Sequence, residues 1–354
     1  MDGRERGIRP YPAAIGSIVL SRRSRLFDST VLPFAPPAPV YPIGRSQVGL
    51  IPGSWLAAGF TVSALCLAAL LVDTGITINL IDFSTFVFAG VFALALALRY
   101  ALRAPRSAAQ RVLRDVAETF GLFTAVSLMG AVSTYPIAAE THGTIDPLLQ
   151  QIDTALHFDW LAWYRVVADH RSLQILGAAA YQSIYLSPAV ILGYCAWADK
   201  RAAARGLIAS FWLAAVIALT LFRFWPAYGP FASLWHGPVP YPTESGMYEA
   251  QLIPLLRNHL LHEVDLGGLR GLVEAPSFHT ASAILYIVAA WPFARIRKPI
   301  LIVNLVMLVA TPVEGTHYLA DMIAGASVAT IALLVVAALR RRLPGHPAPG
   351  AYPR

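Results

Sequence analysis

The chain has 354 residues, of which 56% are hydrophobic and only 13% are charged. Soluble globular domains carry about 25% charged residues, so this composition excludes an ordinary soluble protein and indicates an integral membrane protein. The formal net charge is +7, but the basic residues are distributed as a membrane topology requires, so no nucleic-acid partner is expected.

Residues 1–50 contain seven arginines and seven prolines and precede the first long apolar run. A segment of this composition cannot bury enough apolar surface to fold, so it is predicted to be a disordered cytoplasmic tail. Its arginines could instead contact anionic lipid headgroups, although a solvated tail is the favoured interpretation. Residues 343–354 are predicted to form a second flexible tail.

Eight apolar segments follow one another along the rest of the chain, and most approach the ~20 residues that a helix needs to cross a bilayer. They cover residues 54–72, 80–98, 116–138, 173–198, 205–222, 277–293, 299–312 and 316–339. We therefore predict an all-α, polytopic membrane helix bundle with about eight transmembrane helices. Residues 51–115 are expected to form two accessory helices, and residues 116–342 the core of the bundle.

All but five of the 27 basic residues fall on the same side of this arrangement. The five exceptions are Arg165, Arg171, Arg223, Arg257 and Arg270. Because cytoplasmic loops carry the excess of Lys and Arg, both termini are predicted to be cytoplasmic. Only Lys200 and Lys298 are lysines, and this preference for arginine is typical of a GC-rich bacterial genome, which points to a bacterial inner membrane.

The segment 145–169, between the third and fourth apolar segments, is predicted to be an amphipathic helix at the outer membrane interface. Apolar residues recur there near helical spacing, and Trp160, Trp163 and Tyr164 are of the types that favour the headgroup level. This helix is expected either to pack as a cap on the bundle, which is the favoured interpretation, or to form a wall of a lipid-binding site.

The residues that suggest chemistry lie in two short stretches, Pro276–His279 and His317–Asp321, each at the outer boundary of an apolar segment. Residues four apart share a helix face, so Asp321 can accept a hydrogen bond from one nitrogen of His317 and leave the other free as a nucleophile. The apolar hairpin between the stretches returns the chain to the same face, where His279 can protonate a departing alkoxide. A histidine–aspartate pair that only ties helices together is the structural alternative.

The stretches PSFH and HYLAD together resemble the second and third signature motifs of the type 2 phosphatidic acid phosphatase superfamily. The chain departs from the family pattern, because Phe278 replaces the glycine of PSGH, and Ala310 and Thr311 stand where the third motif has Ser-Arg. The first motif, K-x6-R-P, is missing. These departures and the stretch RFWPAYGP at 223–230 resemble the branch that contains inositol phosphorylceramide synthase, over roughly residues 116–339.

The resemblance implies that His317 forms a phosphohistidine, that Asp321 orients it, and that His279 protonates the leaving group. It implies neither a cofactor nor a metal. Ser277, with Pro276, suits the start of a helix whose free N–H groups could face a phosphate.

A phosphoryl group needs positive charge around it as charge develops, yet the family's lysine and two arginines have no counterpart in this sequence. Guanidinium groups bind phosphate oxygens bidentately, so the outer arginines are the candidate substitutes. Arg257 and Arg223 rank above Arg270, and ordinary charges in a solvated loop are the alternative.

The sequence thus predicts an integral membrane lipid phosphotransferase or phosphatase that acts on a lipid phosphate ester at the non-cytoplasmic face. Its substrate is expected to be a membrane phospholipid, and the acceptor either water or a lipid alcohol. The alternative is a non-catalytic lipid-binding or transport protein on the same fold. Transport is disfavoured because no run of charged residues lies at the midpoints of the apolar segments.

Overall fold

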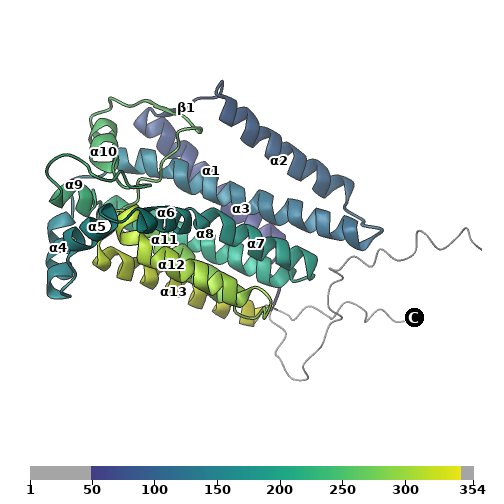
Figure 1. Cartoon of the computed structure of the whole chain (residues 1–354). Helices are drawn as coiled ribbons and strands as arrows, with labels where there is room; N and C mark the ends of the chain where they lie inside the picture. The colour runs from purple at the N-terminus through teal and green to yellow at the C-terminus, as the bar shows by residue number, and fades with distance from the viewer. Residues whose placement is uncertain (1–48, 344–354) are drawn as a thin grey trace, which may run out of the picture. The chain divides into compact units, whose positions relative to one another are not determined.

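The structure, a computed structural model, describes residues 49–343 (Figure 1). The two predicted tails therefore fall almost entirely outside the described residues and stay predictions. Within the described part, the chain is helical apart from one parallel pair of two-residue strands, β1 (Thr77–Ile78) and β2 (Glu263–Val264). The all-α prediction is confirmed.

Each of the eight predicted apolar segments coincides with a helix or with a bent pair of helices. In chain order these are α1 (Gly53–Thr74), α2 (Phe83–Ala101), α3 (Ala108–Ala139), α6 (Arg171–Tyr181) with α7 (Ser183–Trp197), α8 (Arg201–Phe224), α11 (Phe278–Ala290), α12 (Arg297–Glu314) and α13 (Leu319–Arg342). Four short helices lie between them: α4 (Asp146–Ala155), α5 (Trp160–Ala168), α9 (Pro230–Leu234) and α10 (Glu249–Arg257).

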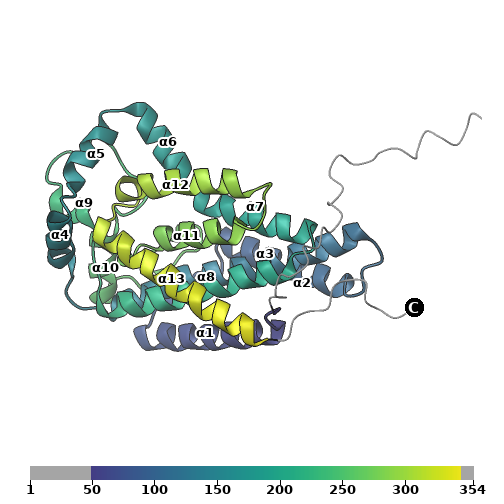
Figure 2. The same cartoon turned by 90° about the horizontal axis from the view of Figure 1, so that it is seen from below.

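Fewer helices than predicted have the length and hydropathy of a membrane span. Among the described residues, α1, α2, α3, α8 and α13 qualify, and α6 with α7 makes a sixth if this pair, bent by 43°, counts as one span. Helix α11 has only 13 residues, and the 18 residues of α12 include three charged ones. Helix α11 is largely buried and packs against α8, α12 and α13 (Figure 2), whereas α12 exposes the apolar side chains of Ile302, Leu305 and Val309.

Acidic residues of α3 hold arginines from neighbouring helices at one end of the bundle. Asp115 pairs with Arg201, and Glu118 pairs with Arg99 at 2.8 Å and with Arg205 at 2.5 Å. These contacts join two loops that the sequence analysis assigned to the cytoplasmic side. We call this end, defined by these five residues, the basic end.

The short helices α4, α5, α9 and α10 gather at the opposite end, here called the site end (Figures 1 and 2). The predicted amphipathic segment 145–169 is two helices, α4 and α5, because the helix breaks after Ala155 and restarts at Trp160. The indole Nε1 of Trp160 donates to the Pro312 carbonyl at 2.6 Å, and the Tyr164 hydroxyl donates to the Tyr241 carbonyl at 2.7 Å. Both rings are buried, so this segment packs on protein as a cap.

Candidate active site

His279 and His317 line the same cavity, which has a volume of about 630 Å³. They are 38 residues apart in the chain, and the hairpin of α11 and α12 returns the second histidine to the site end. The cavity also receives Tyr181 from α6, Glu249 from α10 and Glu274 from the loop before α11. The structure therefore brings together the two histidines on which the sequence prediction depends.

His279 lies in the first turn of α11, and the start of that helix is fixed by Ser277. The Ser277 hydroxyl accepts a hydrogen bond from the Thr280 amide at 3.4 Å, and the Ser277 amide donates to the Asp321 carbonyl at 3.1 Å. The imidazole of His279 is stacked on the ring of Tyr181, with centroids 3.8 Å apart. Ser277, which was predicted to bind phosphate, is fully buried as a helix cap and does not line the cavity.

Close packing also holds α11 to α13 at this point. Gly325 of α13 lies directly against the Ser277 carbonyl, and a Cβ atom at Gly325 would collide with it. The two helices that carry the histidine motifs are thus joined both by a backbone hydrogen bond and by a contact that requires glycine.

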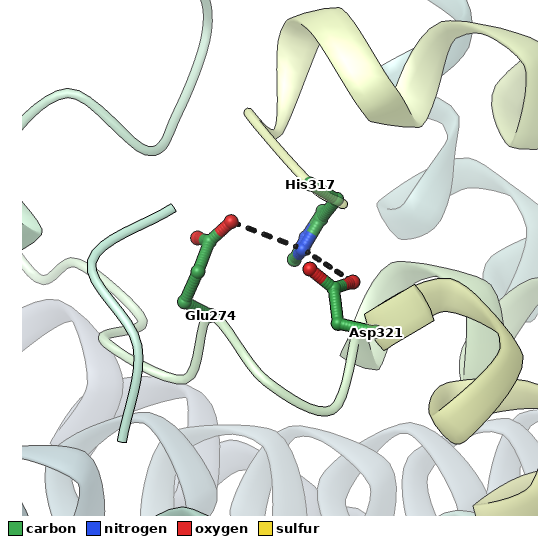
Figure 3. Close-up of side chains that lie close together, drawn as sticks. All are labelled: Glu274, His317 and Asp321. Carbon is green, nitrogen blue, oxygen red and sulfur yellow. Dashed lines mark ion pairs between the residues drawn. The ribbon is translucent and has the colours of Figure 1, made fainter. Parts of the chain in front are cut away.

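His317 stands just before α13, and two carboxylates contact the same nitrogen of its ring (Figure 3). Its Nδ1 lies 3.1 Å from Oδ1 of Asp321 and 3.3 Å from Oε1 of Glu274. Asp321 also accepts a hydrogen bond from the Tyr318 amide at 2.8 Å, which fixes the carboxylate. All three side chains of this group are buried. Both carboxylates lie on the Nδ1 side of the ring at ion-pair distance, although none of these three atoms has a hydrogen-bond partner among the described residues.

Glu274 is a site residue that the sequence analysis missed. Burial raises the pKa of its carboxyl well above the usual range. Gly229 makes room for it: this residue has φ +91°, and a Cβ there would lie 2.8 Å from Oε1 of Glu274. The RFWPAYGP stretch thus contributes a glycine that is required both by its positive φ and by the close approach of Glu274. The one sequence signal for Glu274 is a lone acidic residue two positions before Pro276.

Two aspartates of α4 position the start of α13: Asp153 contacts its first backbone amides, and Asp146 accepts a hydrogen bond from the Tyr318 hydroxyl at 3.2 Å. Asp153 accepts hydrogen bonds from the amides of Leu319 and Ala320 at 2.9 and 2.8 Å. Asp146 accepts one from the Gly229 amide at 2.9 Å. Because carboxylates satisfy the free N–H groups of a helix start, α4 fixes the helix that carries Asp321.

The three predicted phosphate-binding arginines lie in different surroundings. The guanidinium of Arg257 donates to Thr141, Tyr228 and the Gly143 carbonyl at 2.8 to 3.0 Å, and Arg223 pairs with Glu140 at 3.4 Å. Neither lines the cavity.

Arg270 does line the cavity, and its guanidinium lies 4.8 Å above the ring of Tyr248. Of the three candidate arginines, the one ranked last in the sequence analysis is therefore the one that lines the cavity with the histidines.

The donor atoms of Glu274, His317 and Asp321 lie within 4.8 Å of one another, a spacing that could accommodate a divalent cation bound by one nitrogen and two oxygens. No other group of this kind is found among residues 49–343. Ion-pair contacts of the imidazole with the two carboxylates account for the same distances, and metal analysis of the purified protein distinguishes the two interpretations.

Comparison with known proteins supports the chemistry that this geometry suggests. No curated protein and no solved structure matches the chain. A model of the PAP2 superfamily matches residues 147–335, a stretch that begins in α4, includes both histidines and ends within α13. The match spans more than half of the chain, and the chain belongs to the PAP2 superfamily.

Proposed function

We propose that this protein is a membrane phosphatase or phosphotransferase that acts on a lipid phosphate ester through a phosphohistidine formed on His317. Membership of the superfamily supports phosphatase or phosphotransferase chemistry. The observation that supports a lipid substrate is the shape and lining of the cavity.

The cavity joins an apolar interior to the polar site. At one end its walls are side chains from the membrane-spanning helices, including Phe120 and Phe123 of α3, Leu192 of α7 and Phe211 of α8. At the other end stand the two histidines. A ligand that fills such a space has an apolar chain and a polar head, and the reacting phosphate lies where the two parts join. A water-soluble phosphate ester would leave the apolar part unused.

In the proposed reaction, Nε2 of His317 attacks phosphorus, and the bond from phosphorus to the leaving oxygen breaks. Burial disfavours an imidazolium at His279, so the ring takes up its proton beside the anionic phosphate and gives it to the leaving oxygen as the alkoxide departs. Asp321 and Glu274 stabilise the positive charge that the attacking ring acquires. Water or an alcohol then attacks the phosphohistidine, and His279 accepts its proton, which restores both histidines.

Arg270 is the guanidinium placed to stabilise the phosphoryl oxygens, because it lines the cavity that both histidines line. We assign the reacting end of the cavity to the non-cytoplasmic face of a bacterial inner membrane, with both termini cytoplasmic. This assignment is supported by the arginine-rich loops, which meet at the basic end, away from the histidines.

Turnover of a labelled phospholipid by the purified full-length protein tests the function. His317→Ala and His279→Ala are each expected to abolish turnover while the protein keeps its thermal unfolding midpoint. Near-normal turnover by either variant would refute the role given to that histidine. If the wild-type protein binds phospholipid but turns over none, the non-catalytic lipid-binding alternative replaces the enzyme.

The same assay separates hydrolysis from transfer. The departures that resemble the inositol phosphorylceramide synthase branch favour a phosphodiester donor and an alcohol acceptor. Labelled phosphatidylinositol and labelled phosphatidylethanolamine are therefore each incubated with and without ceramide or diacylglycerol. A new labelled lipid that forms only with an acceptor supports transfer, and release of water-soluble products alone refutes it.

A further inference from the structure

The polar end of the cavity has more acidic side chains than a phosphate-binding site needs. Among the described residues that line it, Glu244, Glu249 and Glu274 are acidic, whereas Arg270 is the one arginine and no lysine is present. Asp321 lies directly behind His317 and adds a further carboxylate. A donor whose headgroup carries no positive charge would leave the negative charge of its phosphodiester uncompensated in this field.

Glu244 and Glu249 have no part in the proposed reaction, and Glu244 accepts a hydrogen bond from Gln182 at 2.8 Å, which leaves Glu249 without a role. It lies in the first turn of α10 and its side chain is buried, with 1% of its surface exposed. Its Oε2 has no hydrogen-bond partner among the described residues. Buried acceptors are normally satisfied, so a buried and unpartnered carboxylate oxygen beside a cavity points to a hydrogen-bond donor on the ligand.

Arg270 does not take the place of that donor. It is close enough to lower the pKa of Glu249, but no ion pair between Arg270 and Glu249 is present within residues 49–343. Its guanidinium lies over the ring of Tyr248 instead. Arg270 therefore remains available for phosphoryl oxygens, and Glu249 for a different group of the same molecule.

We propose that the donor lipid has a headgroup with a primary ammonium, as in an ethanolamine phospholipid, and that Glu249 binds this ammonium. The proposal rests on the proposed function and specifies its substrate class. A primary ammonium supplies N–H donors to the unpartnered oxygen and a positive charge to the acidic end of the cavity. A quaternary ammonium has the charge but no N–H, and a polyol has donors but no charge.

The protonation behaviour of Glu249 agrees with this assignment. Burial raises the pKa of its carboxyl to about 7. Burial makes the negative charge on Glu249 costly. A bound cation favours the ionised carboxylate, so an ammonium beside Glu249 stabilises that charge.

The experiment compares donors that differ only in their headgroup, with the full-length protein in mixed micelles. Phosphatidylethanolamine, its N,N-dimethyl derivative, phosphatidylcholine, phosphatidylglycerol and phosphatidylinositol are supplied with identical acyl chains. Wild-type kcat/KM is expected to be highest for phosphatidylethanolamine, to fall with methylation, and to be at least tenfold lower for the two anionic lipids.

Glu249→Gln keeps the shape of the side chain and removes its charge. This variant is expected to lose at least tenfold in kcat/KM for phosphatidylethanolamine and to keep or raise its kcat/KM for phosphatidylglycerol. Glu263→Gln is the matched control, because Glu263 is exposed and contacts Asn79 away from the cavity; it should change neither value. Thermal unfolding confirms that both variants are folded.

The possible results separate the two proposals. If phosphatidylglycerol or phosphatidylinositol is turned over as well as phosphatidylethanolamine, or if Glu249→Gln affects all donors equally, the ammonium site is refuted and the enzyme remains. If no lipid is turned over, the proposed function fails. Native mass spectrometry of bound phosphatidylethanolamine against phosphatidylglycerol then still decides the ammonium site, and equal occupancy overturns it.

Discussion

Substitution of Glu274 by glutamine tests whether the reacting histidine depends on two carboxylates. The change keeps the size of the side chain but removes a negative charge 3.3 Å from Nδ1 of His317, while Asp321 remains at 3.1 Å. The Glu274 carboxylate interacts most strongly with the imidazole when the ring becomes positive during attack on phosphorus. The lost interaction therefore belongs to the transition state and the phosphohistidine, and kcat should fall while KM changes little.

The expected size of the effect follows from the contact. An interaction with a charged partner contributes ~1.5–3 kcal/mol, and each 1.36 kcal/mol of barrier is a factor of ten in rate. The kcat of Glu274→Gln is accordingly expected to be about 10- to 150-fold below wild type. Asp321→Asn should have a larger effect, because Asp321 also accepts the Tyr318 amide and orients the ring.

The assay is steady-state turnover of a phospholipid in mixed micelles by purified wild-type protein, Glu274→Gln and the exposed control Glu263→Gln. Thermal unfolding is measured on the same samples. An unchanged kcat for Glu274→Gln, or a loss confined to KM, would show that Glu274 only fills space beside Gly229. A loss accompanied by unfolding would show a structural role instead.

Three further results are expected. Arg270→Ala should lower kcat/KM by an amount that corresponds to ~1.5–3 kcal/mol of lost transition-state stabilisation. Arg257→Ala should lower the unfolding temperature and leave the kcat/KM of the folded protein nearly unchanged. The opposite pattern would restore the order expected from the sequence. The raised pKa of Glu249 means that the folded protein binds this proton more tightly than the unfolded chain, so the free energy of unfolding should fall by up to about 3 kcal/mol as the pH rises from 4.5 through 7. This slope should flatten in Glu249→Gln, and an equal slope in both proteins contradicts the assignment. Activity should survive prolonged treatment with EDTA, with metal content far below one ion per chain; a loss that Zn²⁺ restores would make the carboxylates around His317 metal ligands.

The sequence predicted the parts of this protein that depend on regular spacing. Apolar runs located the helices, and the position of the two histidine motifs on an apolar hairpin placed His279 and His317 at one end. Fewer helices of the described residues meet the length and composition of a membrane span than the eight apolar segments, because α11 has only 13 residues and α12 carries three charged ones.

The residues that complete the site could not be predicted in the same way. Glu249 and Glu274 lie in a long connection without periodic pattern, and their proximity to His317 depends on how that connection folds over the site end. Asp153 has the spacing of a surface helix residue, yet its carboxylate caps a helix that begins 166 residues later in the chain. Contacts of this kind are set by tertiary packing, which a local pattern does not contain.

Gly325 allows the start of α11 to pack directly against α13, and this close approach sets the spacing of the two helices that carry the histidine motifs. Any larger residue at position 325 forces α11 and α13 to separate, and a shift of about 1 Å in reacting groups can cost a hundredfold in rate. An enzyme built around so tight a helix crossing has little tolerance for lipid-induced sliding of its spans. Changes in bilayer thickness should therefore act on its catalytic rate through this crossing.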